Sequence, residues 1–453
     1  MFANHAIMKG ETHQDRRQRL AAHLQKNSSE PIRLAKATSN LFRPRESKPR
    51  HILDVTDFNH VLNVDVQTGL IEVEGMATYE QLVAATLPNG LMPAVVPQLK
   101  SITIGGAISG IGIESSSFHH GLVHESVHEM DVLLANGDVV TCTAENEHRD
   151  LFFGLPNSYG TLGYILKLKA MCIPIKPYVK LTHIRITDSI DFFSTLKNIC
   201  TENVDFVDGT VFDRHDHYIT VGRFVDEAPY TSDYTYLDIY FRSITTRQED
   251  YLSTHDYLWR WDTDWFWCSK NLFLQNILMR RLLGRKHLNS ITYQKVMRWN
   301  TRINLTSTLN RWLGYHTESV IQDVDIPINN ASKFLDFFHR EIGMQPIWIC
   351  PVKNKSEKNS FPLFPMTQDT LYINFGFWGV IRGRKKLSAG HYNRKVESMV
   401  ADLGGIKSLY SSSFYPKNEF WSYYNGTMYQ ELKQRYDPNY RLNDLYKKSV
   451  LHQ

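Results

Sequence analysis

Paired cysteines, a strong excess of one charge and long apolar runs are all missing from this sequence of 453 residues. Its five cysteines (Cys142, Cys172, Cys200, Cys268 and Cys350) are odd in number and far apart, and no CxxC pair occurs. These absences exclude a disulfide framework and a cysteine-based zinc site, and they favour a reducing cytoplasm.

Charge and hydropathy narrow the class of protein further. Lysine and arginine number 51 against 47 aspartates and glutamates, a net charge of +4, so charge alone predicts no nucleic-acid partner. The first twenty residues lack the apolar stretch of a signal peptide. No run approaches the roughly 18 apolar residues that a transmembrane helix needs. We therefore expect a soluble, cytoplasmic protein that is at most peripheral on the inner face of a membrane.

The distribution of apolar residues and glycines predicts an α+β protein with two or three domains. Residues 1–29 form a polar extension with one short helix over DRRQRLAAHLQK. Residues 30–180 carry short β-rich runs divided by glycines, and residues 181–404 mix strands with helices again. The aromatic-rich residues 405–453 form a C-terminal segment.

Local signals place individual elements in the 30–180 region. Strands are predicted at residues 50–55, 63–65 and 70–74, and over TLGYILKLKAMCIPI. Thr78 is the predicted N-cap of the helix YEQLVAATL. The pair Asn136-Gly137 predicts a hairpin whose turn has positive φ at both residues.

The second region shows the same two periodicities. Strands are predicted over HIRIT, HYITVGRFV, SVIQDVDIPI, PIWICPV and TLYINFGFWG, and helices over DFFSTLKNIC and NASKFLDFFHREI. An insert at residues 251–312 differs in kind, because it is dense in tryptophan and holds ten Lys/Arg residues against three acids.

The most informative stretch is PQLKSITIGGAISGIGIESSS at residues 97–117. Four glycines lie within eight residues, and glycine lets backbone N–H groups approach a polyanion without a Cβ in the way. The interleaved Ser and Thr hydroxyls add neutral donors, so the stretch predicts a pyrophosphate site. Tight turns in a β-rich domain are the alternative explanation.

Two familiar nucleotide motifs do not occur in this glycine-rich region. The absence of GxxxxGK[ST] argues against a P-loop NTPase, and the absence of GxGxxG between a strand and a helix argues against a Rossmann domain. A second glycine-rich segment, NSYGTLG at residues 157–163, leads directly into a predicted strand.

His120, His124 and His128 follow one another at intervals of four residues, which on a helix would align them like metal ligands. However, GLVHESVHEMDVLL begins with glycine and continues with alternating β-branched residues, which predicts loop and strand. We therefore predict no metal site.

The order of these parts resembles the PCMH-type FAD-binding domain of the vanillyl-alcohol oxidase superfamily. The parts are KATSNLFR, the helix YEQLVAATLPNGLMPAVVP, TIGGAISG, the NGDVVTCT hairpin and GTLGYILKLKA. More narrowly, GGAISGIGIESSSFHHGL, SVIQDVDIPI, PIWICPV and LYSSSFYPKNEFWSYYNGTMYQEL resemble the Δ24-sterol reductase group and its bacterial relatives. Some of those relatives reduce methylene-branched fatty acyl chains. The resemblance covers roughly residues 30–450, and GIESSS is its most specific part.

This resemblance implies a two-subdomain FAD-binding domain at residues 30–180, an α+β cap domain for the substrate at 181–404, and a C-terminal segment that returns to the FAD site. Covalent members of the superfamily carry a histidine in the first loop, and KATSNLFRPR has none, so the implied FAD is non-covalent. The implied FAD contacts are Thr38, Ser39, Asn40, Arg43, Thr103, Ile104, Gly105, Gly106, Ser109, Gly110, Gly112, Ile113, Glu114, Ser115, Gly160, Thr161, Gly163 and Ile165.

Reduction of a C=C bond needs a hydride at one carbon and a proton at the other, so a general acid must lie near the flavin. The resemblance makes Tyr410, Tyr415 and Glu114 the candidates. The alternatives are that Tyr410 is a core aromatic residue and that Glu114 accepts hydrogen bonds from backbone N–H groups of its loop.

The insert at 251–312 has two interpretations. Its tryptophans with Arg280, Arg281, Arg285 and Lys286 suit an interfacial helix on anionic lipid. Alternatively, the tryptophans pack the cap domain and the arginines contact water.

The function implied by the resemblance is FAD-dependent, NADPH-driven reduction of a C=C bond in a lipid, either a sterol side chain or a methylene-branched acyl chain. The rival enzyme is an FAD-dependent oxidase or dehydrogenase of an alcohol, sugar or acyl substrate. A non-catalytic protein that binds a lipid surface is the rival of another class. The sequence makes no prediction about oligomeric state.

Overall fold

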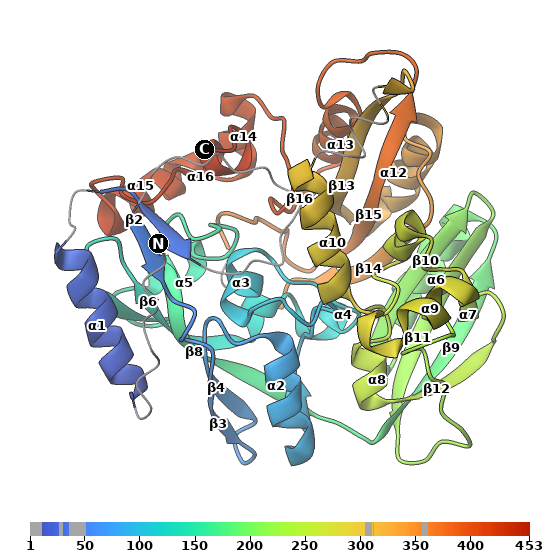
Figure 1. The fold of residues 1–453 in the computed structure, drawn as a ribbon, viewed down its shortest axis with the longest axis horizontal. Coiled ribbons are helices and arrows are strands. Elements are labelled where there is room, and N and C mark those ends of the chain that lie inside the picture. The colour runs from blue at the N-terminus through green and yellow to red at the C-terminus, as the bar shows by residue number, and fades with distance from the viewer. Residues whose placement is uncertain (1–10, 27–29, 36–50, 304–309, 311, 356–360) are drawn as a thin grey trace.

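The computed structural model describes residues 11–26, 30–35, 51–303, 310, 312–355 and 361–453. Across these residues the strands form a two-stranded, a six-stranded and an eight-stranded sheet. The two large sheets lie side by side with short helices between them (Figure 1). The α+β fold predicted from the sequence is confirmed, whereas the predicted domain boundaries remain predictions.

The six-stranded sheet has the order β3 (Val61–Asp65), β4 (Leu70–Glu74), β8 (Tyr164–Pro174), β6 (Val127–Leu133) and β7 (Val139–Thr143), with β5 (Leu91–Pro93) paired to β8. Buried and partly exposed residues alternate along β8, as expected for a strand with one face on a core. Four further elements belong to this part of the chain: α2 (Tyr79–Thr86), η1 (Leu87–Asn89), α4 (Ser117–His120) and α5 (Arg149–Gly154).

Two local predictions in this sheet have different outcomes. Thr78 caps α2 through a capping box, in which Thr78 and Gln81 exchange side-chain and backbone hydrogen bonds of 2.9 and 3.3 Å. The β6–β7 hairpin is also present, but of the two turn residues only Gly137 has positive φ. Asn136 instead accepts a hydrogen bond from the backbone N–H of Asp138 at 3.0 Å, so the turn is a longer one than predicted.

The eight-stranded sheet comes mainly from the predicted cap region, with β16 (Ile406–Lys407) added by the predicted C-terminal segment. Its order is β12 (Glu249–Ser253), β9 (Tyr178–Ile186), β11 (Asp216–Val225), β10 (Phe206–Asp213), β14 (Ile347–Lys353), β15 (Leu371–Gly383), β13 (His316–Pro327) and β16 (Ile406–Lys407). Strands β10, β12 and β16 were not predicted from the sequence. Helices α6 (Ser189–Ile199), α12 (Ile328–Glu341) and α13 (His391–Asp402) cover one face.

Alternation along β14 shows how the second face of this sheet is used. Ile347 and Ile349 pack in the helix-covered core, whereas Trp348 and Cys350 pack in the core shared with the six-stranded sheet. The short helix α7 (Tyr240–Ser243) and, within the 251–312 insert, α8 (Thr254–Leu258) with Trp259, Trp261 and Trp267 join this second core. The 3₁₀ helix η3 (Cys268–Leu272) packs in a separate small core with Trp265, Leu274, Leu288 and Tyr293. The insert continues as α9 (Ile277–Leu283), η4 (Arg285–His287) and α10 (Ser290–Ile303).

Both ends of the described chain pack on the six-stranded sheet. The parallel pair β1 (Ile32–Ala35) and β2 (His51–Asp54) joins α1 (His13–Lys26) in a small core. Glu74 ties α1 to β4: its burial would raise the pKa, but hydrogen bonds from His13, Arg16 and His60 lower the pKa to about 2. The tail forms α14 (Lys417–Tyr423), α15 (Gly426–Tyr436) and α16 (Leu445–Ser449), and the buried Lys433 donates to the Thr161 carbonyl at 2.7 Å.

Within the described residues, no helix combines the length and the apolar character needed to cross a bilayer.

Candidate active site

A cavity of about 440 Å³ lies between the two large sheets and reaches the β1–β2 pair. One side of it has almost no side chains, because glycine supplies much of the wall. The glycines that line this side are Gly75, Gly105, Gly106, Gly110, Gly112, Gly160 and Gly163.

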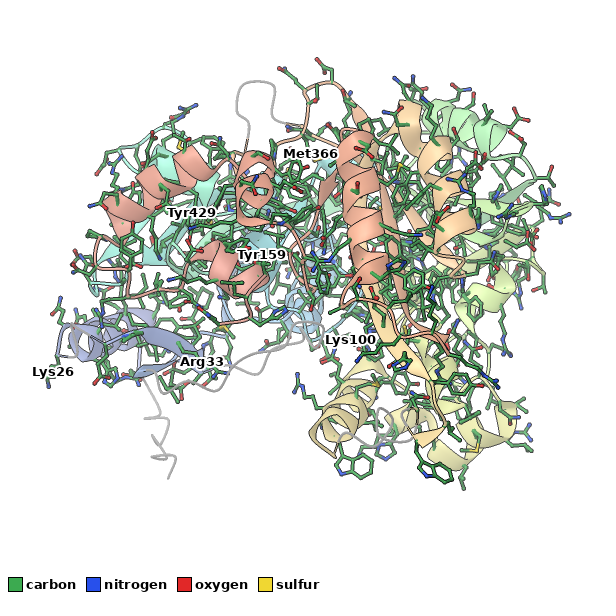
Figure 2. The ribbon with its side chains drawn as sticks, turned by 90° about the horizontal axis from the view of Figure 1, so that it is seen from above. Lys26, Arg33, Lys100, Tyr159, Met366 and Tyr429 are labelled. Carbon is green, nitrogen blue, oxygen red and sulfur yellow. The ribbon has the colours of Figure 1, made fainter. Side chains whose placement is uncertain are left out.

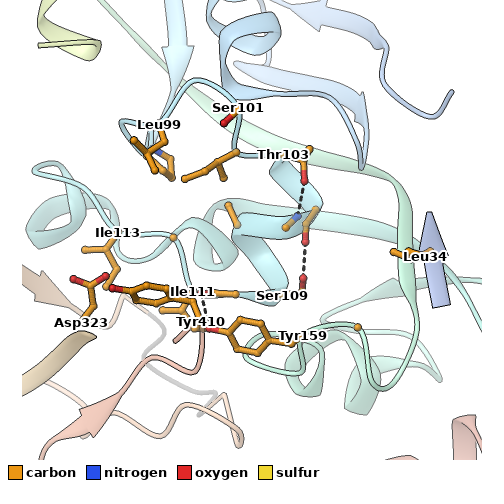
Figure 3. A pocket seen from close by; sticks show the side chains of 18 of the residues that line it. Leu34, Leu99, Ser101, Thr103, Ser109, Ile111, Ile113, Tyr159, Asp323 and Tyr410 are labelled. Carbon is orange, nitrogen blue, oxygen red and sulfur yellow. Dashed lines mark hydrogen bonds between the residues drawn. The ribbon is translucent and has the colours of Figure 1, made fainter. Parts of the chain in front are cut away.

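The glycine-rich stretch contains a short helix, α3 (Ile104–Ser109), where the sequence suggested only a loop. Thr103 caps it by accepting a hydrogen bond from the Gly106 N–H at 3.3 Å (Figure 3). A Cβ at Gly105 would lie 2.7 Å from the Gly75 carbonyl oxygen, so this glycine permits close packing of α3 on the sheet. Gly106 and Gly110 line the cavity. The glycines therefore serve both roles considered from the sequence, tight packing and an open wall.

The end of the glycine-rich stretch has an unusual backbone. Ile111 lines the cavity with φ of +60°, a conformation that β-branched residues rarely adopt. Tyr159, with φ of +52°, holds the stretch by donating its backbone N–H to the Ser109 carbonyl at 3.0 Å and its hydroxyl to the Gly110 carbonyl at 3.1 Å. Such strained positions concentrate at ligand sites, where the surrounding structure fixes them.

A cavity wall of this kind fits the diphosphate of a dinucleotide, because backbone can approach the phosphates closely. Two cationic side chains also line the cavity, Arg33 from β1 and Lys448 from α16. Lys448 donates a hydrogen bond to the Tyr159 carbonyl and so lies beside the glycine wall.

The opposite end of the cavity is apolar and aromatic. Trp265, Phe266, Trp348 and Trp378 line it, and the rings of Phe266 and Trp378 lie 4.8 Å apart between centroids. Trp265, Phe266 and Trp267 all have positive φ, so three consecutive aromatic residues form a left-handed turn. Each such residue costs about 1–2 kcal/mol, and the turn directs two of the rings into the cavity.

Most of the insert's tryptophans are buried, which supports the interpretation that they pack the cap. Trp259, Trp261, Trp265 and Trp267 are at most 7% exposed. Arg280 is also buried, donating to the carbonyl oxygens of Tyr236 and Leu274, so it is not part of a lipid-facing surface.

Between the glycine and aromatic ends, Tyr410 and Asp323 lie side by side beneath Ile111 and Ile113 (Figure 3). The Tyr410 hydroxyl accepts a 2.9 Å hydrogen bond from the Trp378 indole N–H and hydrogen-bonds Asp323. Burial raises the pKa of Asp323 to about 7, and the bond from Tyr410 only partly opposes this effect. Burial and the neighbouring carboxylate raise the pKa of Tyr410 well above its usual value.

Glu114 belongs to a buried ion cluster that joins the glycine-rich stretch to the cap. Arg260 from the insert contacts Glu114 at 3.2 Å and Asp208 of β10 at 2.9 Å, and Gln98 donates to Glu114 at 2.5 Å. Burial raises the pKa of Glu114, and Arg260 opposes that rise. These side-chain contacts differ from the acceptor role toward backbone N–H groups that the sequence suggested as an alternative, and the catalytic role of Glu114 stays a prediction.

Tyr415 lies outside the cavity lining, and its ring packs on Tyr423 and Tyr424 at centroid distances of 5.3 and 6.2 Å. His120, His124 and His128 belong to α4, the 3₁₀ turn η2 (Val123–Ser126) and β6 in turn, so no single helix aligns them. His124 packs edge-on against Phe361, and burial lowers its pKa to about 3.

Comparison with known proteins agrees with this geometry. Residues 13–143 match the family model of an FAD binding domain. The delta(24)-sterol reductase of Arabidopsis thaliana is 26% identical over 428 residues, covering 86% of this chain and 75% of that protein. The delta(24)-sterol reductase of Homo sapiens is 29% identical over 391 residues, covering 83% and 73%. The chain is an FAD-dependent oxidoreductase, and its residues 13–143 carry the FAD binding domain.

A third relative of this flavoprotein is similar over a much shorter stretch of the chain. The decaprenylphosphoryl-beta-D-ribose oxidase of Mycolicibacterium smegmatis is 30% identical over 141 residues, which cover 31% of this chain and 30% of that protein. The likeness to the two sterol reductases, by contrast, covers 86% and 83% of this chain.

The cavity brings together most of the residues predicted to contact FAD. Four of the predicted contacts, Thr38, Ser39, Asn40 and Arg43, lie outside the described residues. Ile104, Ser115 and Thr161 are buried behind the wall; Ser115 hydrogen-bonds Tyr257 of the cap at 2.9 Å. The predicted contacts that line the cavity are Thr103, Gly105, Gly106, Ser109, Gly110, Gly112, Ile113, Glu114, Gly160, Gly163 and Ile165.

The sequence analysis missed several lining residues, chiefly Arg33, Asp323, Trp348, Trp378 and Lys448. A signal existed for Asp323, because carboxylates at 323 and 325 interrupt an otherwise apolar predicted strand. In the structure, Gly376 of β15 pairs with Asp323, and a Cβ at Gly376 would lie 2.8 Å from Asp323 Oδ1.

Replacing Gly106 with valine is expected to abolish FAD retention, because a branched side chain would fill space that the pyrophosphate needs. The measurement is the FAD released per mole of protein on denaturation. The matched control is Gly383→Val, since a Cβ at Gly383 meets open space. Wild-type flavin content in Gly106→Val would contradict the assignment of this wall.

Proposed function

We propose that this flavoprotein reduces an isolated C=C bond of a lipid, with NADPH as the source of electrons. The names of the relatives favour a sterol side chain as the substrate, and a methylene-branched fatty acyl chain is the second form of the same proposal. The observation that carries it is the cavity, which joins a glycine wall suited to FAD to an aromatic pocket suited to an apolar substrate, with Tyr410 and Asp323 at the junction.

The aromatic end would hold the lipid and exclude water. Its walls are indole and phenyl rings with Leu272, Cys268 and Met297, and they offer few polar groups. A substrate without ionic groups is therefore favoured over a sugar or a charged acid.

FAD, when bound, supplies the hydride for one carbon of the double bond. Tyr410 donates its hydroxyl proton to the other carbon, so that one π bond is lost and two C–H bonds form. Trp378 holds the Tyr410 oxygen in place through its indole N–H. With a pKa of about 7, Asp323 is protonated in a large share of molecules at neutral pH and can return a proton to Tyr410.

Anaerobic reduction of the bound flavin tests the proposal. NADPH should bleach the flavin absorbance, and a lipid with the appropriate double bond should restore it and become heavier by two hydrogens. Bleaching by an alcohol, a sugar or a saturated lipid without NADPH would support an oxidase or dehydrogenase instead. Purified protein without FAD would support the non-catalytic lipid-binding alternative.

The two substrate classes are separated in the same assay. A sterol with a side-chain double bond and a phospholipid with a methylene-branched acyl chain are offered to the NADPH-reduced protein, and products are weighed by mass spectrometry. Reoxidation by neither lipid would overturn the substrate assignment while leaving the FAD site intact.

A further inference from the structure

The 251–312 insert and the residues just after it expose an unusual number of large apolar side chains. α9 shows most of its length to solvent, with Leu278 67% and Leu282 81% exposed. Nearby in sequence, Trp299 of α10 is 56% exposed and Trp312 is 82% exposed. We call this set the α9–α10 surface: Phe273, Ile277, Leu278, Met279, Leu282, Val296, Trp299, Trp312 and Leu313.

The same part of the chain is strongly basic. Residues 265–317 contain nine Lys/Arg residues and no Asp or Glu. The remaining 400 residues therefore have 42 basic and 47 acidic side chains, a net of −5. Arg281, Lys286 and Lys295 are exposed among the apolar side chains. The positive charge of the protein is thus concentrated where its apolar side chains are exposed.

The α9–α10 surface also adjoins the aromatic end of the cavity. Leu272 at the end of η3 and Met297 of α10 line the cavity, whereas Phe273 and Val296, their neighbours in the chain, are exposed. The segment that carries α9 and α10, yellow in Figure 2, projects as a lobe from one side of the molecule. One lobe therefore has an inner face on the cavity and an outer face in solvent.

We propose that the α9–α10 surface docks on an anionic phospholipid bilayer. Leucine, phenylalanine and tryptophan side chains of the outer face enter the interfacial region, and Arg281, Lys286 and Lys295 contact lipid phosphates. A second copy of this chain is a poorer occupant, because two identical surfaces without acidic groups would repel each other. Delivery of the lipid substrate from the bilayer to the cavity additionally rests on the proposed function, whereas docking does not.

Vesicle co-sedimentation of the full chain tests docking without any substrate. The wild type should sediment with vesicles of equal parts phosphatidylglycerol and phosphatidylcholine, and more weakly with phosphatidylcholine alone. Arg281→Gln with Lys286→Gln should lower the partition coefficient on the anionic vesicles about 25-fold at low salt, because each lost charge contributes about fivefold, and less at high salt. Leu278→Ser with Leu282→Ser should lower it at least tenfold on both vesicles.

The control is Ile190→Ser, an equally exposed apolar residue (68%) on α6, which should sediment like the wild type. All five substituted positions are exposed, so each variant is expected to fold. Flavin content and melting temperature verify this. Equal sedimentation of the wild type and both double variants would overturn the proposal. So would a wild-type dimer in gel filtration that becomes monomeric in Leu278→Ser with Leu282→Ser, because a second copy would then be the occupant.

Discussion

Replacing Arg260 with methionine is expected to lower the free energy of unfolding by about 3–5 kcal/mol. Arg260 is 2% exposed, contacts Glu114 and Asp208, and lies over the Tyr257 ring at 4.0 Å. Methionine fills much of the volume but leaves two buried carboxylates without a cation. Urea denaturation monitored by tryptophan fluorescence measures the loss.

A matched surface pair provides the control for this large effect. Arg223 contacts Glu202 at 3.2 Å, and both side chains are about half exposed. Arg223→Met should therefore change stability by no more than about 1 kcal/mol. Adding Glu114→Gln and Asp208→Asn to Arg260→Met should recover part of the loss, since the uncompensated charges are then gone.

The Arg260→Met defect should also shrink as the pH falls. Burial raises the pKa of both Glu114 and Asp208, and removal of Arg260 removes the main opposing influence. The native state of the variant then binds more protons than its unfolded state, so its stability decreases as the pH rises. A deficit that is the same at pH 5 and pH 8 would show that these carboxylates are not its cause.

Tyr410→Phe is expected to lower turnover by about 10²–10⁴-fold while FAD remains bound, because this change removes only the proposed proton donor. Stopped-flow measurement of flavin reoxidation by the lipid isolates the affected step, and reduction by NADPH should stay at the wild-type rate. The control is Tyr230→Phe, an exposed tyrosine of the cap. Wild-type reoxidation in Tyr410→Phe would dismiss the acid role.

Asp323→Asn distinguishes a proton relay from simple packing. Turnover of the wild type should fall as the pH rises above about 7, where Asp323 loses its proton, and the asparagine variant should lack this inflection. The raised pKa also means that the contribution of Asp323 to native-state stability declines between pH about 4 and about 7, since the native carboxyl holds its proton more tightly than the unfolded one. Asp226→Asn, at a surface pair with Lys176, should alter neither profile.

The sequence predicted elements whose signals are local. Thr78 with Gln81, the alternation along β8 and the amphipathic α12 each depend on neighbours within a few residues. The strand β10 was missed because Asp208 and Gly209 interrupt its apolar run. The buried carboxylate of Asp208 is compensated by Arg260, which lies 52 residues away along the chain and donates a hydrogen bond to it.

The residues of the candidate site also fall into two groups, those that local sequence predicts and those that depend on tertiary contacts. Most of the glycine wall comes from two short stretches, residues 105–112 and 160–163, which were recognised from the sequence, whereas Gly75 was not. Asp323, by contrast, interrupts an apolar strand, but its partner Tyr410 and the Trp378 that hydrogen-bonds Tyr410 come from separate parts of the chain, so its role could not be predicted from the sequence. The left-handed turn at Trp265–Trp267 has no local signal either, because those residues disfavour that backbone and only tertiary packing imposes it.

The cavity wall joins β1 near one end of the chain to α16 near the other, since Arg33 and Lys448 are both part of it. During synthesis on a ribosome, the enclosure is incomplete until some 400 residues separating these two have emerged and folded. Cofactor capture is then a late event in biogenesis, and a ligand that binds only the finished enclosure adds its binding energy to the native state at that moment. Growth under riboflavin limitation should therefore leave a pool of fully translated but protease-sensitive apoprotein.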